Sequence, residues 1–138
     1  MLMKQLSVFL KNNQGTLADL VCLLGRNGIG LEAAVLADTS RYGVFRAIVT
    51  DSEKALRLLQ DNNYSACLTD VLCVRMPDAA DGAGQVLTAL NEDNTDIEYL
   101  YVLKRGGENA LVLGVLDPER SARLLSDKGF QCLSKKNG

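Results

Sequence analysis

The sequence predicts an α+β fold built from two βαββαβ units in tandem, each an antiparallel sheet with its helices on one face. Alternating apolar residues mark the strands, and apolar residues three and four positions apart mark the helices. The order of elements in the first half of the chain recurs in the second half, which indicates an internal repeat. Three pairs of matching positions lie 66 to 68 residues apart: Gly15 with Gly82, Ile29 with Ile97, and Asp51 with Asp117.

The first repeat begins with a strand at Met3–Leu10. Leu6, Val8 and Leu10 form one face of this strand and alternate with Gln5, Ser7 and Phe9 on the other. The helix after it has an apolar stripe at Leu17, Leu20, Val21 and Leu24. The remaining predicted elements are a hairpin of strands at 29–37 and 44–49, a helix that buries Ala55, Leu58 and Leu59, and a strand at 64–70. In the "TDSE" stretch before the second helix, Thr50 is the predicted N-cap.

The second repeat shows the same order of elements in 71–138. Its predicted elements are strands at 71–76, 97–103, 110–116 and 130–133, with helices at about 82–91 and after "DPE" at 117–119. Asp117 is the predicted N-cap of the last helix, with Pro118 at its first position. We therefore expect a first domain at residues 1–70 and a second at 71–138. No linker separates them, since Asp70 is followed directly by Val71.

The composition excludes several classes of function. The net charge of −2 disfavours a protein whose main task is to bind nucleic acid or an anionic membrane. No apolar run approaches the roughly 18 residues that span a bilayer, and the N-terminal stretch lacks a signal-peptide pattern. We therefore expect a cytoplasmic protein with no membrane partner.

The chain contains no histidine, which removes the usual proton carrier near neutral pH and excludes Ser-His-Asp, Cys-His and His-metal chemistry. The four cysteines are scattered and form no C-x-x-C pair, so we expect reduced, buried thiols and no metal site. Paired acids such as Glu92 and Asp93 indicate a solvated surface. We expect no enzyme activity and no cofactor.

Three alternatives that rest on glycine spacing or on topology are weaker. "GRNGIG" at 25–30 resembles a phosphate-binding loop, but the helix precedes it and the strand follows, which is the reverse of a dinucleotide site. A nucleic-acid-binding ferredoxin-like domain shares the βαββαβ order. That function needs aromatic and basic residues on the central strands, and aromatic residues are 5% of this chain. An acylphosphatase-like enzyme would need an arginine in the first loop, where 11–14 reads KNNQ.

The stretch "LKNNQGTLADL" at 10–20 joins the first strand to the first helix. Asn and Gly are common turn residues, and Asn13 is a candidate helix cap. The N–H groups and dipole of a helix N-terminus also favour a carboxylate, and asparagine amides suit an amino-acid zwitterion. A glycine at 15 allows the backbone to approach a ligand closely.

These residues carry a resemblance to a known family. The first half, from Ser7 through "NGI" at 27–29, resembles an ACT domain, a small regulatory module that binds amino acids. Asn12, Gly15 and Leu17 stand at the positions of the family pattern, and the first half is most similar to the regulatory subunit of acetolactate synthase. The second half matches mainly in element order, and its loop "DAADGAG" lacks the asparagine.

The resemblance implies a non-catalytic sensor that holds an amino-acid effector where two ACT units meet. The implied ligand-binding residues are the loop residues Asn12, Asn13, Gln14, Gly15, Thr16 and Leu17, and the opposing-strand residues Leu31, Glu32 and Ala33. Asn12 would bind the head group of the amino acid. Asp78, Asp81 and Gly82 would be the weaker counterparts in the second repeat.

The expected partners are a free amino acid and a second copy of the chain, because sheet edges are exposed in this topology. The main alternative is a regulatory subunit that docks on an amino-acid biosynthetic enzyme, such as acetolactate synthase, without a ligand of its own. A nucleic-acid-binding domain is the least favoured alternative.

Overall fold

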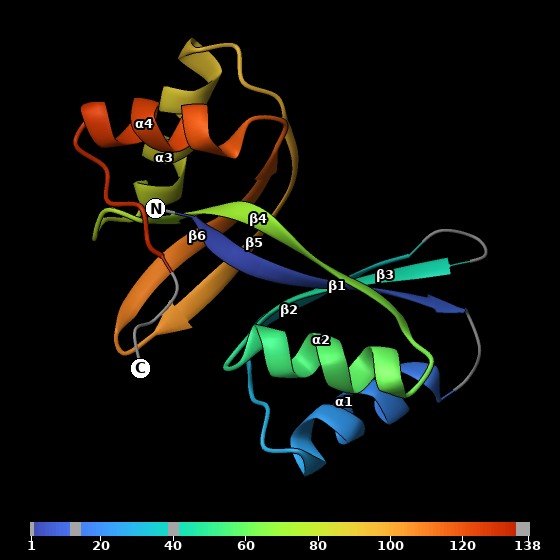
Figure 1. Ribbon diagram of the computed structural model, residues 1–138. Helices are drawn as coiled ribbons and strands as arrows, with labels where there is room; N and C mark the ends of the chain where they lie inside the picture. The colour runs from blue at the N-terminus through green and yellow to red at the C-terminus, as the bar shows by residue number, and fades with distance from the viewer. Residues whose placement is uncertain (1, 12–14, 39–41, 135–138) are drawn as a thin grey trace. The chain divides into compact units, whose positions relative to one another are not determined.

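The computed structural model describes residues 2–11, 15–38 and 42–134 of the 138-residue chain. The chain forms two compact units (Figure 1). The first unit is Lys4–Thr69, and the second unit is Asp70–Gly138 together with Met1–Met3.

The first unit is an antiparallel sheet with two helices on one face. Its elements are β1 (Met3–Lys11), α1 (Thr16–Arg26), β2 (Leu31–Asp38), β3 (Tyr42–Val49), α2 (Ser52–Asp61) and the first part of β4 (Ser65–Arg75), with strand order β2-β3-β1-β4. The alternation in β1 directs Leu6, Val8 and Leu10 toward the helices. These side chains pack with Leu20 and Leu24 of α1 in a core from which water is excluded.

The second unit repeats this arrangement with strand order β4-β6-β5. Its elements are the last part of β4, α3 (Gly82–Glu92), β5 (Ile97–Arg105), β6 (Glu108–Val115) and α4 (Pro118–Asp127). Leu72 and Val74 of β4 and Leu111 and Leu113 of β6 face the helices and are buried with apolar residues of α3 and α4. The predicted α+β class with tandem βαββαβ-like units is confirmed.

Two predicted strand details differ. The strands expected at 64–70 and 71–76 are the single strand β4, because no turn residue separates Asp70 from Val71. The strand expected at 130–133 is an isolated bridge between Val74 and Cys132. Two backbone hydrogen bonds hold this segment against β4, from the Arg75 N–H to the Gln131 carbonyl at 2.9 Å and from the Leu133 N–H to the Cys73 carbonyl at 2.7 Å.

The helix caps correct one prediction and confirm another. Asp51, and not Thr50, caps α2, because its extended backbone lets its carboxylate accept the Lys54 N–H at 3.1 Å. The Thr50 hydroxyl oxygen instead accepts the Gly30 N–H at 3.0 Å, which secures the turn before β2. Asp117 caps α4 as predicted, accepting the Arg120 N–H at 3.2 Å.

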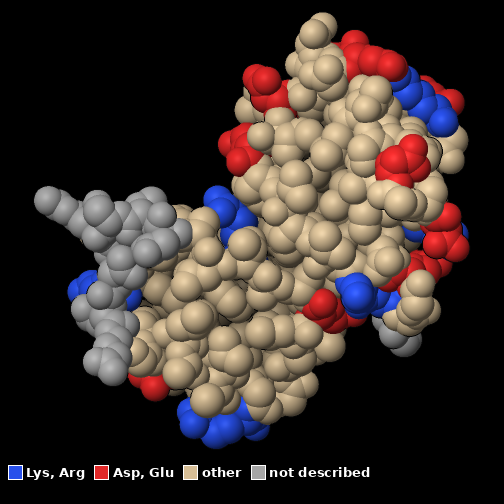
Figure 2. Space-filling view, turned by 180° about the vertical axis from the view of Figure 1, so that it is seen from behind, with Lys and Arg blue, Asp and Glu red and all other residues tan. Residues whose placement is uncertain are grey.

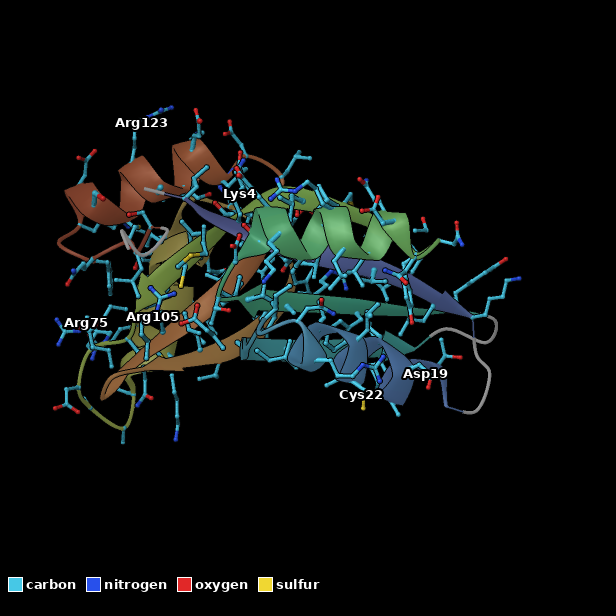
Figure 3. The ribbon with its side chains drawn as sticks, turned by 60° about the horizontal axis from the view of Figure 1, so that its bottom comes forward. Lys4, Asp19, Cys22, Arg75, Arg105 and Arg123 are labelled. Atoms are coloured by element: carbon cyan, nitrogen blue, oxygen red, sulfur yellow. The ribbon has the colours of Figure 1, made fainter. Side chains whose placement is uncertain are left out.

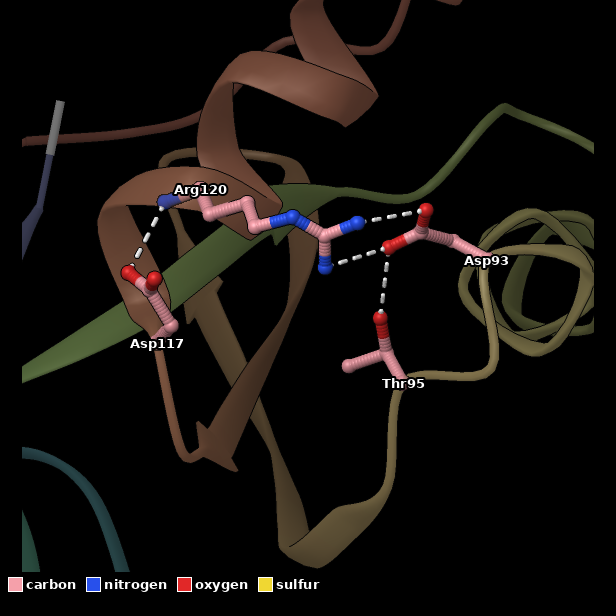
Figure 4. Close-up of polar contacts among 4 residues, drawn as sticks. All are labelled: Asp93, Thr95, Asp117 and Arg120. Atoms are coloured by element: carbon pink, nitrogen blue, oxygen red, sulfur yellow. Dashed lines mark hydrogen bonds and ion pairs between the residues drawn. The ribbon is translucent and has the colours of Figure 1, made fainter.

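The acids at the end of α3 form ion pairs at the protein surface, where the Glu92 side chain is 64% exposed. The Asp93 carboxylate accepts both terminal nitrogens of Arg120, at 2.9 and 3.0 Å, and the Thr95 hydroxyl at 3.1 Å (Figure 4). Lys128 pairs with Glu92 at 3.1 Å. Such a bidentate arginine–carboxylate contact fixes the relative orientation of the two side chains and also stabilises the folded chain. The two ion pairs tie the end of α3 to both ends of α4.

The cysteines correct a second expectation. Cys73 is buried and Cys132 is partly buried, but Cys22 and Cys67 are exposed; none of these four described cysteines forms a disulfide bond. Figure 3 shows Cys22 on the outer side of α1. Desolvation raises the pKa of the Cys132 thiol above its ordinary value, with a hydrogen bond from Ser126 acting in the opposite direction.

The loop between β4 and α3 packs tightly on its own backbone. The Ala79 N–H donates to the Pro77 carbonyl at 2.8 Å, and the Gly82 N–H donates to the Ala79 carbonyl at 3.0 Å. A Cβ at Gly82 would collide with the Pro77 carbonyl oxygen, whereas a Cβ at Gly84 meets nothing within 4 Å. The loop therefore requires glycine at position 82 and tolerates a side chain at position 84.

Thiol labelling tests the burial of the cysteines. We expect Cys22 and Cys67 to react rapidly with a thiol reagent at pH 8, and Cys132 more slowly, because its raised pKa leaves less of the reactive thiolate. Cys73 should react only after unfolding. Quantitative mass spectrometry after timed labelling measures the four rates, and a C22S/C67S variant should lose the fast phase. Rapid labelling of Cys73 in the folded chain would contradict this packing.

Two glycine substitutions in one short segment should change stability in opposite directions. Gly82→Ala should lower the free energy of unfolding by about 1–3 kcal/mol, because the loop must move to admit the methyl group. Gly84→Ala should raise it by roughly 0.5–1 kcal/mol, because alanine favours the exposed position of α3. Urea denaturation followed by circular dichroism measures both. Equal effects of the two substitutions would show that Gly82 is not confined by Pro77.

Candidate functional site

The predicted first-repeat loop lies between β1 and α1. Asn12, Asn13 and Gln14 fall outside the described residues. Gly15 is the N-cap of α1, with a left-handed backbone at φ 86°, and its carbonyl accepts the Asp19 N–H at 2.9 Å. Apart from its chain neighbours, no atom of the described residues lies within 4 Å of the place where its Cβ would be. The backbone conformation therefore explains the glycine, and the space beside it is open.

Thr16 and Leu17 form the first turn of α1, next to Gly15. Thr16 is partly buried. Leu17 was expected on the apolar stripe of the helix, but its side chain is 36% exposed, whereas Leu20 and Leu24 are fully buried. Leu17 thus presents an apolar surface beside the loop and contributes little to the core.

The predicted opposing-strand residues Leu31, Glu32 and Ala33 begin β2, the outermost strand of the first unit. The pairing register shifts between Leu31 and Ala33, so Glu32 is the extra residue of a β-bulge. Leu31 is 40% exposed and Ala33 is buried. Bulges at sheet edges often redirect side chains beside functional sites.

Within the first unit, these two groups of residues lie at opposite ends of the sheet. Lys11, at the loop end of β1, pairs with Tyr42 at the start of β3. Leu31 pairs with Val49 at the end of β3. Seven residue steps along an antiparallel strand span about 23 Å. The first unit therefore does not bring Gly15 and Leu31 together, and a site containing both needs a second unit.

The second-repeat loop, residues 76–81, places its three predicted residues in different surroundings. Asp81 precedes α3, and its side chain accepts the Gln85 amide at 2.9 Å instead of a backbone N–H. Gly82 is buried beneath Pro77. Asp78 is exposed and lines a surface pocket. Of these residues, Asp78 alone lies in that pocket.

The pocket has a volume of about 360 Å³ and lies between the second-repeat loop and the β5–β6 turn. Its lining residues are Arg75, Met76, Pro77, Asp78, Ala79, Ala80, Gly107, Glu108 and Asn109. The Met76 N–H donates to the Asn109 carbonyl at 2.9 Å, which holds the two walls together. The volume is within the range of small-molecule sites.

Arg75 provides the positive charge of this pocket at the end of β4 (Figure 3). Its guanidinium lies 3.8 Å from the Glu108 carboxylate and donates to the Gln131 side chain at 3.3 Å. The arrangement offers a cation, Arg75, to the carboxylate of an amino acid. It offers two carboxylates, Asp78 and Glu108, to the ammonium group. The arrangement contains no nucleophile–base pair.

The sequence interpretation did not identify Arg75, Glu108 or Asn109 as pocket residues. They meet because Arg75 pairs with Ala110 across β4 and β6, so the β5–β6 turn lies beside the loop. This register is a long-range pairing. The sequence feature that could have indicated the pocket is the charged residue Arg75 at the end of a predicted strand, together with the glycine-containing turn at Gly106 and Gly107.

Other kinds of site find little support in the described residues. Within 2–11, 15–38 and 42–134, no cluster of Cys, Asp and Glu side chains is arranged to hold a metal ion. In the same part of the chain, no helix has the length and apolar character needed to cross a membrane. On the face seen in Figure 2, the coloured Lys and Arg side chains of the described residues lie in small groups among acidic ones, without a continuous basic stripe.

Comparisons with known proteins agree with this fold. No curated protein sequence matches the chain. The protein BT0572 from Bacteroides thetaiotaomicron has a similar structure with a TM-score of 0.88 and 30% identity, covering 96% of this chain and 92% of that one. The regulatory subunit of aspartate kinase from Thermus thermophilus, in its ligand-free form, has a TM-score of 0.63 and 13% identity, with 90% and 91% covered.

A larger enzyme contains the same fold. Aspartokinase III from E. coli, in complex with lysine and aspartate, has a TM-score of 0.51 and 18% identity over 91% of this chain and 31% of the enzyme chain. The family model described as "ACT domain pair" matches residues 1–138. With the tandem topology described above, this match shows that the chain belongs to the ACT domain pair family.

Proposed function

We propose that this protein is a non-catalytic regulatory sensor that binds a free amino acid where two ACT units meet. The observation that carries the proposal is the separation of about 23 Å between the two halves of the expected site within the first unit. Loop residues 12–17 of one unit and Leu31, Glu32 and Ala33 of another would form one complete site. Binding of the ligand would then favour one arrangement of the units over others.

The chemistry of the first-repeat loop supports an amino-acid ligand. The start of α1 offers backbone N–H groups and a positive helix end to a carboxylate, worth about 0.3–1 kcal/mol when exposed. Gly15 leaves room for close approach, and the exposed Leu17 offers apolar contact. Asn12 would bind the head group. Micromolar to millimolar affinity, roughly −8 to −4 kcal/mol, needs only a few such contacts.

The second repeat would bind differently. Its loop lacks the asparagine, but the pocket beside it combines Arg75 with Asp78 and Glu108. Asp81 bonds Gln85 and Gly82 is buried, so the ligand contacts would come from the wall of the pocket and not from the start of α3. We therefore propose unequal affinities for the two repeats.

We further propose a homodimer that acts in the cytoplasm, where it meets the pool of free amino acids. The alternative function is a regulatory subunit docked on an amino-acid biosynthetic enzyme without a ligand of its own. The fold of the aspartate kinase regulatory subunit supports a partner of this general kind. An acetolactate synthase remains the candidate suggested by the first half of the sequence.

A thermal-shift screen with all twenty amino acids at millimolar concentration tests the sensor function. We expect stabilisation by one or a few of them, because a ligand at a hundredfold excess over Kd adds about 2.7 kcal/mol to the stability of the folded chain. The absence of any shift would contradict the sensor function. Recovery of a stoichiometric enzyme from native extract, unaffected by amino acids, would support the docking alternative.

Asn12→Ala tests the first-repeat loop directly. We expect it to weaken binding of the amino acid found in the screen by about 1–3 kcal/mol, because a buried partner group of the ligand loses its hydrogen bond. Isothermal titration calorimetry measures the affinity, and urea denaturation should show nearly unchanged stability. Gln60→Ala, at an exposed position of α2, is the matched amide control. Equal affinities in both variants would exclude Asn12 from the site.

A further inference from the structure

Two surface pockets of the second unit share one wall, the segment from Arg75 to Asp78. The pocket of about 360 Å³ lies between this segment and the β5–β6 turn, and a second pocket of about 290 Å³ lies between it and residues 129–131. The larger pocket is part of the proposed function, whereas the C-terminal segment that forms the far wall of the smaller one has no role there. A side chain of that segment that reaches Arg75 can therefore act on the larger pocket.

Gln131 is the residue of the C-terminal segment that reaches Arg75. Val74 and Cys132 form an antiparallel bridge, so the next residues, 75 and 131, lie directly opposite each other. Phe130 and Cys132 pack against the core of the second unit, and the alternation of side chains directs Gln131 to the other face. The Arg75 backbone N–H donates to the Gln131 carbonyl at 2.9 Å, and Arg75 Nη1 donates to Gln131 Oε1 at 3.3 Å. The same residue thus holds the backbone and the side chain of Arg75.

This contact leaves one edge of the Arg75 guanidinium available to the larger pocket. A guanidinium has five N–H donors in a planar fork, and its Nε–H and one N–H of Nη2 point along the same edge. A hydrogen bond at Nη1 leaves that edge unoccupied. Nε lies 3.8 Å from Glu108 Oε1, which is an ion pair but is too long for a hydrogen bond. Since Glu108 lines the larger pocket and Gln131 lines the smaller one, the Nε edge is on the side of the larger pocket.

The held orientation suits a carboxylate ligand. A carboxylate can accept two parallel hydrogen bonds from the Nε edge of Arg75 in place of the loose contact with Glu108. Asp78 and the displaced Glu108 then remain for the ammonium group. An arginine side chain that must give up its rotamer freedom when the ligand binds lowers the affinity. A contact that orders the guanidinium beforehand reduces this loss.

We infer that Gln131 is a positioning residue of the larger pocket, which fixes the Arg75 guanidinium so that its Nε edge binds the carboxylate of an amino acid. This inference rests on the proposed binding of an amino acid in the second repeat and adds the C-terminal segment to that site. Gln131 acts through Arg75 and does not touch the ligand. The affinity of the second repeat therefore depends on the docking of residues 130–133 against β4.

Nuclear magnetic resonance of the isotope-labelled full chain tests this inference through two N–H groups. The Gly107 backbone N–H belongs to the wall of the larger pocket and reports its occupancy, and the Arg75 Nε–H reports carboxylate binding. Each of the twenty amino acids is titrated to millimolar concentration. We expect every amino acid that shifts the Gly107 signal to shift the Arg75 Nε–H signal as well, with the same dissociation constant.

Gln131→Met removes the acceptor but keeps the length of an exposed side chain. The dissociation constant measured at Gly107 should rise roughly three- to tenfold, the effect of one hydrogen bond. Without ligand, the Arg75 Nε–H of this variant should become as mobile as that of Arg123, an exposed arginine of α4 (Figure 3). Gln60→Met, the same change at an exposed position of α2, is the matched control and should alter neither quantity.

A double-mutant cycle separates positioning from a structural role. Arg75→Lys keeps the charge and lacks the planar fork, so adding Gln131→Met to it should not weaken binding further. Urea denaturation should show the same stability for Gln131→Met and Gln60→Met.

The outcomes distinguish this inference from the proposed function. Weaker binding in Gln131→Met, with no further loss in the Arg75→Lys background and native circular dichroism throughout, supports the role of Gln131. An unchanged dissociation constant, an equal loss in the Arg75→Lys background, or a Gly107 shift without an Arg75 Nε–H shift overturns it and leaves amino-acid binding in the pocket standing. If no amino acid shifts Gly107, the second-repeat site and the role of Gln131 are both overturned, and shifts confined to the first unit leave the first-repeat site standing.

Discussion

The length of the antiparallel strands is the constraint on which the proposed site depends. In the first unit, the first residue of β3, Tyr42, pairs with the last residue of β1. The last residue of β3, Val49, pairs with the first residue of β2. The loop at Gly15 and the bulge at Glu32 are therefore held apart by the sheet itself, and no rearrangement of side chains brings them together. A ligand that contacts both must bridge two units, so ligand binding and assembly become coupled processes.

The two repeats use glycine at the same position for different physical reasons. Gly15 adopts a left-handed backbone next to open space, whereas Gly82 lies directly beneath the Pro77 carbonyl. The backbone conformation thus accounts for Gly15, whereas close packing of the second loop on its own backbone accounts for Gly82. The pocket of the second unit lies instead against the β5–β6 turn, where Arg75 provides the charge.

Much of the fold could be predicted from local patterns. The helix periodicity of Leu20 and Leu24, the alternation of Leu6 and Val8, and the Asp117 cap all act within a few residues and were read correctly. The wrong predictions concern positions where the local pattern fits a role that the folded chain does not give to that residue. Thr50 and Asp51 are both acceptable N-caps. The extended backbone of Asp51 makes it the cap of α2, and the Thr50 hydroxyl instead accepts a hydrogen bond from the Gly30 N–H. Leu17 matched the apolar stripe, but its place in the first turn leaves it exposed.

The candidate site was less accessible to sequence reasoning. Asp78 and Asp81 are three residues apart and chemically alike, yet one lines the pocket and the other bonds Gln85. The pocket residues Arg75 and Glu108 are brought together by the register of β4 and β6, and many residues separate them in sequence. Glu92 is solvent-facing as predicted, but the ion pair of Asp93 with Arg120 could not be predicted, because Arg120 belongs to a different helix.

The bulges have a consequence for solubility. Both outer strands carry one at the same point of the repeat, at Glu32 and at Glu98. A bulge twists the edge of a sheet and interrupts the regular row of backbone N–H and C=O groups to which an incoming strand would hydrogen-bond. At both outer strands this irregular edge makes the sheet a poor template for a growing fibril.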